Sequence, residues 1–415
     1  MTLRSRLRIG ALYVGGLLGP FGGAMTTSML PELGSTYDVS VTATTASLTA
    51  YLVPFAGLML ISGTIGERYG RGRTVVLGYA VYTVASLAAA VAPTYELFLA
   101  ARVAQGAANA FTTPLLLAAL GSTVPVARLG RSLGTFASVQ AIGQSSSPLV
   151  GGLAAEFDWR WAFVGAAVVS AVLGLIGLPR PTVPAPRVPG GSRLRSLWHR
   201  DVGRLAVVAM ASWACLGGLN FLVAIRAEDS FGLSSSQRGL LLTGFGFVGL
   251  LGGRLVGRAV DHWGPRRCAL AGGVTGGVLV ALCAFWTPAA GLAVGWALCG
   301  IASQFVLVSL NSLSLSAVPA NRGGAVSVVQ AFRFGGGALA PAAWLPLYHL
   351  SPSAGFLVPG LILATVVGLA LGRRDRTTAR EAAPVSPVRG ELLRHESLGT
   401  DVTAGRAGSG RCCSG

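Results

Sequence analysis

Apolar segments of about 20 residues recur along the whole chain, and short polar breaks separate them. A helix of about 20 residues crosses the roughly 30 Å hydrocarbon core of a bilayer. Charged residues make up 11% of the chain, whereas they make up about 25% of an ordinary soluble domain. The repeated apolar segments and the scarcity of charge together predict a multi-pass membrane protein made of helices.

Twelve such segments can be delimited, so the fold class that we expect is an all-α membrane protein with twelve transmembrane helices. The predicted spans are residues 9–30, 45–66, 74–92, 97–120, 133–154, 161–178, 205–227, 239–259, 268–287, 290–312, 324–347 and 354–372. The first segment could also be a signal peptide, but no convincing small-residue cleavage site follows it. It is therefore interpreted as a retained span.

The basic residues are all Arg, and they give the chain a formal net charge of +17. Such a charge can indicate nucleic-acid binding, but 26 of the 32 Arg lie in the N-terminus, alternate loops and the tail. The opposite loops hold only Arg160, Arg226 and Arg238. Because short cytoplasmic loops are enriched in basic residues, we expect both termini in the cytoplasm. The absence of Lys is typical of a GC-rich bacterial genome, so the predicted location is a bacterial cytoplasmic membrane.

The longest polar break divides the chain into two parts of six predicted helices each. Residues 179–204 are rich in Pro, Gly, Ser and Arg, which is typical of a solvated linker. We therefore expect an N-terminal bundle at 1–178, a cytoplasmic linker at 179–204 and a C-terminal bundle at 205–372. Residues 373–415 are polar and Arg-rich, and they are predicted to form a disordered cytoplasmic tail.

The two parts repeat one another in sequence. Gly63, Glu67 and Gly70 have the same spacing as a second set of residues 194 positions later, Gly257, Asp261 and Gly264. Further matches occur at offsets of 194 or 193: Gly106 with Gly300, Phe111 with Phe305, Gly143 with Gly336, and Pro148 with Pro341. Two six-helix repeats predict two pseudo-symmetric bundles, with a binding site near the membrane midplane where they meet.

These motifs give the chain a resemblance to transporters of the major facilitator superfamily over residues 9–372. Residues 63–73 resemble the loop 2–3 motif of that superfamily, with Glu67 in place of the usual Asp. The sequence Arg102-Val-Ala-Gln105-Gly106 resembles the fourth-helix motif of the twelve-helix drug/proton antiporter branch. The sequence Gly143-x3-Ser147-Pro148-x2-Gly151-Gly152 resembles the fifth-helix antiporter motif, although Ser147 stands where Gly is usual.

The resemblance implies a gating role for the motif at Gly63, Glu67, Arg68, Gly70 and Arg71. The second copy of the motif adds Asp261, Gly264 and Arg267 to this predicted site. Carboxylates at the cytoplasmic ends of helices can pair with Arg and accept hydrogen bonds from a neighbouring helix N-terminus. Partners from opposite bundles would latch the cytoplasmic side. The alternative is an Arg-rich loop that contains incidental acids.

Arg102 lies near the outer third of the fourth predicted span, where an unpaired Arg costs a few kcal/mol. It therefore needs a partner or a wet cavity, unless it extends to the outer surface. The repeat places Trp296 at the equivalent position, so the fold alone does not require Arg there. The resemblance links Arg102, with Gln105 and Gly106, to proton transfer.

Arg333 lies about ten residues, or roughly 15 Å, inside the eleventh predicted span. We expect it to face the central cavity and to bind an anionic or carbonyl-bearing substrate; the alternative is a structural partner for helix carbonyls. Gln140 occupies the repeat-related position in the fifth span. Further candidate cavity residues are Asn109, Gln144, Asn220, Gln304, Asn311 and Gln330, with Tyr13, Tyr51 and Trp213.

The fifth-span motif predicts a bent, tightly packed helix, because Pro148 removes a backbone hydrogen bond and Gly143, Gly151 and Gly152 permit close approach. This bend could be purely structural, in which case it carries no transport role.

The predicted spans leave no carboxylate for the membrane midplane, although proton coupling ordinarily uses a buried titratable acid. Glu32, at the outer end of the first span, is the best remaining proton carrier, and Glu228 and Asp229 come next. Glu32 could instead be a solvated charge at a helix end.

We expect a monomeric, proton-driven exporter of small, moderately apolar compounds such as antibiotics or other secondary metabolites. An importer or exchanger of organic anions is the alternative within transport. An enzyme is not expected, since we find no nucleophile–His–Asp arrangement, metal-ligand cluster or phosphate-binding loop in the sequence. No cofactor and no nucleic-acid partner are predicted.

Overall fold

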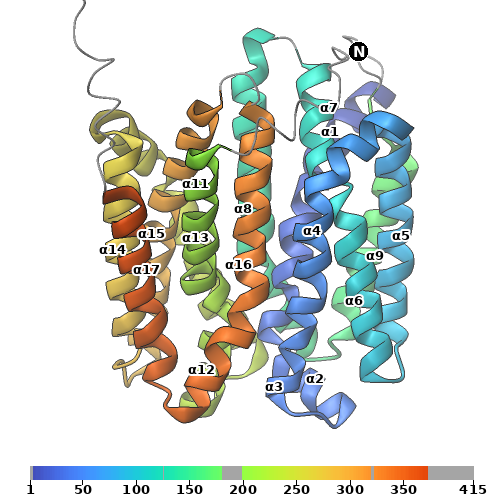
Figure 1. Cartoon of the computed structure of the whole chain (residues 1–415). Coiled ribbons are helices and arrows are strands. Elements are labelled where there is room, and N and C mark those ends of the chain that lie inside the picture. Colours follow the sequence, from blue (N-terminus) through green and yellow to red (C-terminus); the bar gives the residue numbers. More distant parts are fainter. Residues whose placement is uncertain (1–2, 125, 180–198, 319–321, 373–415) are drawn as a thin grey trace, which may run out of the picture. The chain divides into compact units, whose positions relative to one another are not determined.

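The computed structural model describes residues 3–124, 126–179, 199–318 and 322–372 of the chain (Figure 1). These residues belong to the first of two compact units, Met1–Arg373, and they form helices without a strand. The second unit, Arg374–Gly415, lies outside the described residues, and so does the predicted disordered tail. Most of the predicted linker, residues 180–198, also lies outside them.

The first half of the bundle contains the helices that precede the linker. They are α1 (Leu3–Ala24), η1 (Met25–Ser28), α2 (Leu30–Tyr37), α3 (Val41–Thr44), α4 (Ala46–Tyr69), α5 (Arg71–Val91), α6 (Tyr95–Ala110), α7 (Thr113–Thr123), α8 (Val126–Ala155) and α9 (Arg160–Ile176). In Figure 1, α8 stands beside the second half and α5 and α9 lie on the far side of the first half.

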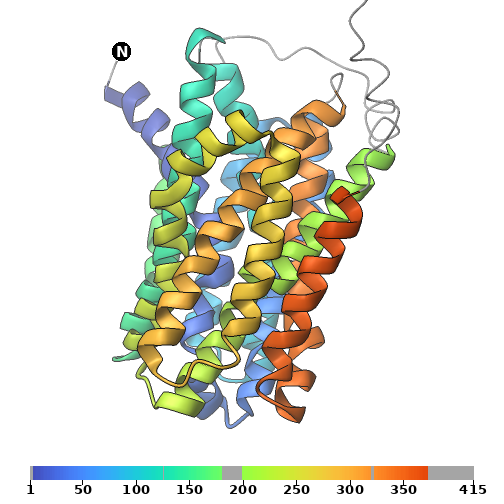
Figure 2. The ribbon, with the colours of Figure 1, turned by 90° about the vertical axis from the view of Figure 1, so that its left-hand side faces the viewer.

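The second half contains the helices that follow the linker. They are α11 (Arg200–Cys215), η2 (Gly217–Leu219), α12 (Asn220–Phe231), α13 (Ser235–Trp263), α14 (Pro265–Leu282), α15 (Ala289–Ala317), α16 (Arg322–Leu350) and α17 (Ala354–Gly372). Figures 1 and 2 show α2, α3 and α12 at the end of the bundle opposite the start of α1. We call it the acidic end, because Glu32 and Glu228 lie in α2 and α12.

Each of the twelve predicted spans coincides with one helix or with two or three consecutive helices. Eight helical segments of the described chain are long and apolar enough, by length and composition, to cross a membrane. The short helix α9 is apolar but has 17 residues. The predicted all-α membrane fold is therefore confirmed, whereas a count of twelve membrane crossings stays a prediction.

Two predicted spans are each broken into two helices. The fourth span breaks between α6 and α7, where Thr112 Oγ1 donates to the carbonyl oxygen of Asn109 and Pro114 lies in the first turn of α7. A proline fits the first turn of a helix because that turn needs no backbone donor. The seventh span breaks at Leu216, whose φ of −134° and ψ of −84° are not helical. Hydrophobicity alone does not register either break.

The linker ends earlier than predicted, because α11 begins at Arg200 and not at residue 205. His199 caps this helix, with its ring nitrogen accepting a hydrogen bond from the Asp201 backbone N–H at 3.4 Å. The polar residues from Arg200 to Arg204 are therefore helical, although their polarity is typical of a linker. The capping hydrogen bond from His199 stabilises the start of the helix at this point.

The sequence repeat is a repeat of backbone packing. A Cβ atom at Gly106 in α6 would overlap the carbonyl oxygen of Tyr51 in α4. A Cβ atom at Gly300 in α15 would overlap the carbonyl oxygen of Phe245 in α13. Gly300 and Phe245 lie 194 positions after Gly106 and Tyr51, respectively. Close helix approach at small residues is a main source of helix association in membranes.

The repeat also extends to the turns that end α4 and α13. Gly70 has a φ of 90° and Gly264 a φ of 84°, a region that side chains with a Cβ rarely adopt. Both turns lie at the end of the bundle opposite the acidic end, and the positions of the two glycines are displaced by 194 residues. The spacing that the two motifs share therefore corresponds to the same turn in each half.

Replacing Gly106 with Ala should lower the thermal unfolding midpoint of the purified protein, because overpacking a close contact costs about 1–3 kcal/mol. The matched control is Gly253→Ala, since nothing lies within 4 Å of a Cβ at that position in α13. Scanning fluorimetry in detergent compares the two variants. Equal midpoints would contradict the proposed role of the α4–α6 contact.

Candidate functional site

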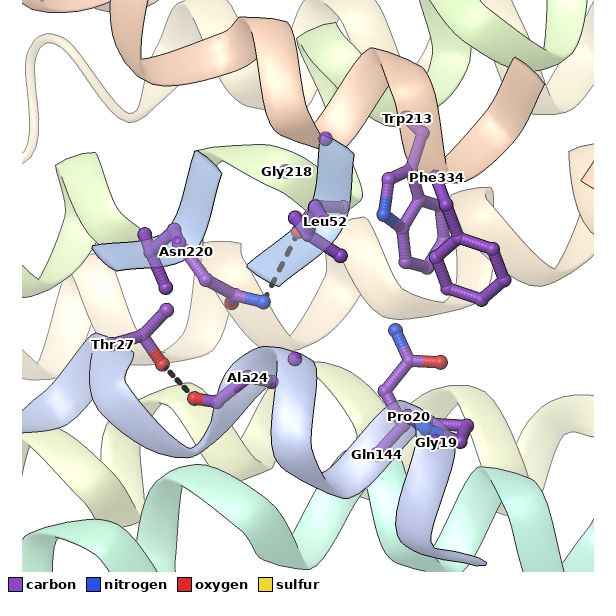
Figure 3. Close-up of a pocket in the computed structure, with 14 residues that line it drawn as sticks. Gly19, Pro20, Ala24, Thr27, Leu52, Gln144, Trp213, Gly218, Asn220 and Phe334 are labelled. Carbon is purple, nitrogen blue, oxygen red and sulfur yellow. Dashed lines mark hydrogen bonds between the residues drawn. The ribbon is translucent and has the colours of Figure 1, made fainter. Parts of the chain in front are cut away.

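A cavity lies between the two halves, and Figure 3 shows the residues around it. It contains about 520 Å³ of space not filled by atoms, part of it open to solvent. Its lining residues are Gly19, Pro20, Gly23, Ala24, Thr27, Leu48, Leu52, Gln144, Trp213, Gly217, Gly218, Asn220, Phe334 and Gly337.

The cavity lies on the axis that relates the two repeats. Four pairs of its lining residues are displaced by 193 positions: Pro20 with Trp213, Ala24 with Gly217, Thr27 with Asn220, and Gln144 with Gly337. Gln144, Asn220 and Trp213 were among the cavity residues predicted from sequence, whereas Phe334 was not. Repeat-built transporters bind their substrates at this interface.

Arg333 contacts two of the residues that line the cavity, Trp213 and Gln144. Its side chain is in α16 and is 8% exposed. The guanidinium carbon lies 3.6 Å from the ring centroid of Trp213, and Nη2 donates to Gln144 Oε1 at 3.3 Å. Nη1 donates to Gln330 Oε1 at 3.3 Å. Arg333 is thus adjacent to the cavity, and its cross-half partner is Gln144 rather than the repeat-related Gln140.

Arg102 is completely buried in the first half and binds backbone oxygens of two other helices. Its Nη2 donates to Gly22 O in α1 at 2.9 Å, and its Nε donates to Ser47 O in α4 at 3.3 Å. Nη1 donates to Gln105 Oε1 at 2.8 Å, and Gln105 in turn donates to Ser86 Oγ. The predicted pair Arg102 and Gln105 therefore joins α1, α4, α5 and α6.

The repeat-related position in the second half is filled by an apolar pair. Trp296 stacks on Phe245 with ring centroids 5.0 Å apart, and Phe245 is the equivalent of Tyr51. In the first half Arg102 lies over Tyr51, 4.5 Å from its ring centroid. Trp296 Nε1 also donates to Asn220 Oδ1 at 3.0 Å. The same helix packing holds Arg102 over Tyr51 in the first half and Trp296 on Phe245 in the second. The fold therefore does not require Arg at this position.

The fifth-span motif packs α8 against both halves. Gly143 and Gly151 face α1 and η1, where a Cβ at either would crowd the backbone oxygen of Leu17 or Met25. Ser147 Oγ, in the place of the usual Gly, donates to Phe21 O at 2.7 Å. Gly152 faces the other way, toward the backbone of Ser235 in α13. Pro148 lies inside the helix, as predicted.

Arg238 joins the two halves at the acidic end, and sequence reasoning missed this role. It lies in the first turn of α13 and is 2% exposed. Its Nη2 donates to both carboxylate oxygens of Glu32 in α2, at 2.6 and 2.8 Å. Nε and Nη2 donate to Ser28 O at 3.2 and 3.1 Å, and Nη1 lies 3.6 Å from Glu228 Oε2. We call Ser28, Glu32, Glu228 and Arg238 the Arg238 cluster.

Arg226 and Arg238 were both counted among the outer loops, but they lie within α12 and α13 and are buried. Arg226 Nη2 donates to Ala284 O at 3.0 Å and to Trp286 O at 3.3 Å, within its own half. The helix α13 begins before the predicted span 239–259, and both Arg residues find oxygen acceptors at this end.

Glu156 makes a second contact between the halves at this end. Its Oε1 accepts a hydrogen bond from the backbone N–H of Ser236, in the first turn of α13, at 3.0 Å. Hydrogen bonds from Ser236 and Ser234 hold the pKa of the exposed Glu156 carboxyl well below its ordinary value, at about 2. A carboxylate at a helix N-terminus is favoured by the helix dipole.

The two predicted gating motifs lie at the opposite end, where Gly63, Arg68, Gly70, Asp261 and Arg267 are exposed. Arg71 Nη1 donates to Ala118 O at 3.4 Å, within the first half. Asp261 has no ion pair among the described residues, and the side chain of Glu67 lies outside them. The predicted cytoplasmic latch therefore remains a hypothesis for another conformation.

Comparison with known proteins gives the chain a family. The sequence profile of the Major Facilitator Superfamily matches residues 12–225 and 205–404. The chain is 34% identical to EfpA of Mycobacterium tuberculosis, described as an uncharacterized MFS-type transporter, over 178 residues, or 42% of this chain and 33% of that protein. It is 34% identical to the puromycin resistance protein pur8 of Streptomyces alboniger over 171 residues, or 40% of this chain and 33% of that protein. The matched region thus spans about a third of these relatives.

A solved structure has the same fold. The human organic anion transporter MFSD10 (TETRAN) superposes with a TM-score of 0.68 over 89% of this chain and 100% of that chain, at 16% sequence identity. This likeness concerns the fold alone.

Replacing Arg238 with Gln should open the acidic end, because removing one partner of a buried ion pair costs about 3–5 kcal/mol. A reporter cysteine at Thr27, which lines the cavity, should then react several-fold faster with a membrane-impermeant maleimide in a background without native cysteines. Arg226→Gln is the matched control, because Arg226 is a buried Arg of the same end that bonds within its own half. Equal labelling in the two variants would refute the bridging role.

The Glu156 contact predicts a pH dependence of stability. Because the pKa of Glu156 is lowered from 4.5 to about 2, the stabilisation by the ionised carboxyl is fully present above pH 4.5. That stabilisation is lost as the pH falls toward 2. The difference in unfolding midpoint between the unaltered chain and Glu156→Gln should therefore be largest above pH 5 and vanish near pH 2. A pH-independent difference would contradict this assignment.

Proposed function

The chain belongs to the Major Facilitator Superfamily, and we propose that this multi-pass membrane protein is a proton-coupled exporter of small, moderately apolar compounds such as antibiotics or other secondary metabolites. The family makes it a transporter rather than an enzyme. The observation that carries the proposal is the cavity on the repeat axis, with a largely apolar lining and a few polar groups. The resemblance to a puromycin resistance protein supports an exported antibiotic.

We infer an alternating-access cycle in which the described conformation is closed at the acidic end. The Arg238 cluster and the Glu156 contact join the halves there. Opening of this end requires these contacts to break, together with the hydrogen bond between Thr42 Oγ1 in α3 and His349 Nε2 in α16. The motifs at Glu67 and Asp261 then latch the opposite end, as the family resemblance implies. This arrangement supports a bacterial cytoplasmic membrane in which the acidic end faces outward and both termini face the cytoplasm.

Glu32 is the proposed proton site, and its ion pair gives the coupling a physical basis. Glu32 is paired with Arg238 of the opposite half while the acidic end is closed, and it loses this partner when the halves part. Exposure of the Glu32 carboxylate to the outside is thereby linked to the arrangement of the halves. Among the described residues that line the cavity, no acid offers itself as a carrier.

Arg102 and Gln105 are proposed to position α1 and α4 around the cavity during this cycle. Arg102 donates to Gly22 O, and Gly23, the next residue, lines the cavity. The cavity is built within one chain, which supports a monomeric transporter. The alternative of organic anion import or exchange gains no support from the curated relatives, one of which is a resistance protein.

Vesicles containing the purified chain should take up at least one compound of an antibiotic panel when an imposed pH gradient drives the transporter in the export direction. A protonophore should abolish uptake, and Glu32→Gln should lower it at least about tenfold, the effect of roughly 1.4 kcal/mol. Glu96→Gln is the matched control, because Glu96 is an exposed acid in the first turn of α6. Uptake that survives the protonophore would refute proton coupling, and absence of gradient-driven uptake of any compound in an antibiotic panel would refute export.

A further inference from the structure

Arg333 is a buried positive charge without a negative partner among the described residues. Its side chain is 8% exposed, and no described carboxylate pairs with it. A buried charge is destabilising unless it is paired, and intramembrane ionisable residues mark substrate or ion pathways. The repeat-related residue is the neutral Gln140, so the fold does not require a charge at this position.

The hydrogen-bonding capacity of this guanidinium is only partly used. Both of its described hydrogen bonds go to neutral amide oxygens, of Gln330 and Gln144, at 3.3 Å. These bonds are longer than the usual 2.9–3.0 Å of N–H···O bonds. The Nε atom is buried and has no hydrogen-bond partner. Arg333 is therefore poised to exchange a weak neutral partner for a stronger one.

The surroundings of Arg333 define the shape of that partner. Trp213 covers one face of the guanidinium at 3.6 Å, so the free approach is through its edge. A carboxylate binds such an edge in the plane of the guanidinium, through two parallel hydrogen bonds. Sulfonates and phosphates share the negative oxygens but not the planar match.

The cavity supplies the route to this edge. Gln144, the amide that receives the Nη2 bond, lines the cavity, and Figure 3 shows it pointing toward the rings of Trp213 and Phe334. A carboxylate that replaces the Gln144 amide therefore leaves the rest of its molecule in the cavity. That part lies beside two aromatic rings and the side chain of Leu52.

We propose that the cavity selects organic carboxylates with a flat apolar body, and that Arg333 binds the carboxylate in place of Gln144. This inference rests on the proposed function and names the substrate class of the same site. Gln144 belongs to the first half and Arg333 to the second, so the bound carboxylate also replaces a direct hydrogen bond between the halves. Substrate binding thereby loosens one contact that holds the halves together.

The inference is tested by binding 2-naphthoate and its neutral analogue 2-naphthamide to the purified full-length chain. Quenching of tryptophan fluorescence reports binding, and the Trp213→Phe variant identifies the part of the signal that arises at this ring. The unaltered chain should bind naphthoate at least about tenfold more tightly than naphthamide. Arg333→Gln should abolish that preference by weakening naphthoate alone.

Two further variants separate binding from folding. Gln144→Ala should raise naphthoate affinity, since the competing amide is gone. Arg226→Gln, which removes a buried Arg bonded to backbone oxygens away from the cavity lining, should keep the preference. A preference retained in Arg333→Gln, equal affinity for the two probes in the unaltered chain, or binding of neither probe would each overturn the inference. If gradient-driven uptake of a compound of the antibiotic panel persists in that case, only the substrate class fails and the proposed function stands.

Discussion

Close approach of helix backbones at glycine is the constraint on which this bundle depends, because lipid gives apolar helices little reason to associate. The contact of Gly106 with Tyr51 brings the backbones of α6 and α4 together, and that of Gly300 with Phe245 does the same for α15 and α13. The same device joins the halves, where Gly152 meets the backbone of Ser235 and Gly239 meets that of Pro148. Glycine permits this approach without adding side-chain bulk, so the halves touch along α8 and α13 and leave space near α1 and α11.

Three buried Arg residues show three ways of keeping a cation inside a membrane protein. Arg102 satisfies its donors with backbone oxygens and an amide, which fixes helices of one half. Arg238 has carboxylates, one of them from the opposite half, so its stabilisation depends on how the halves are arranged. Arg333 has two neutral amides and an aromatic face. The first is structural, the second depends on conformation, and the third is incompletely satisfied by the described chain.

The sequence predicted the features that are periodic or repeated. Runs of apolar residues located the helices, and the matched glycines located equivalent contacts in the two halves. The burial of Arg333 also followed from its depth in a span. The ion pair of Glu32 and Arg238 was not predictable, because the two residues are 206 positions apart and both were counted as outer-side charges. The breaks at Thr112 and Leu216 depend on backbone angles and local hydrogen bonds, which hydrophobicity does not report.

The unlike residues at repeat-related cavity positions have a consequence for the orientation of a ligand. A pocket on a two-fold axis with identical walls would hold an unsymmetrical molecule in two poses of equal energy. Here Trp213 faces Pro20 across the axis, and Asn220 faces Thr27. The ring and the amide occur on one wall only, so one pose is favoured over its rotation-related counterpart by whatever those groups contribute. A duplicated scaffold has thus acquired two unlike walls, and a bound molecule has one preferred orientation about the axis.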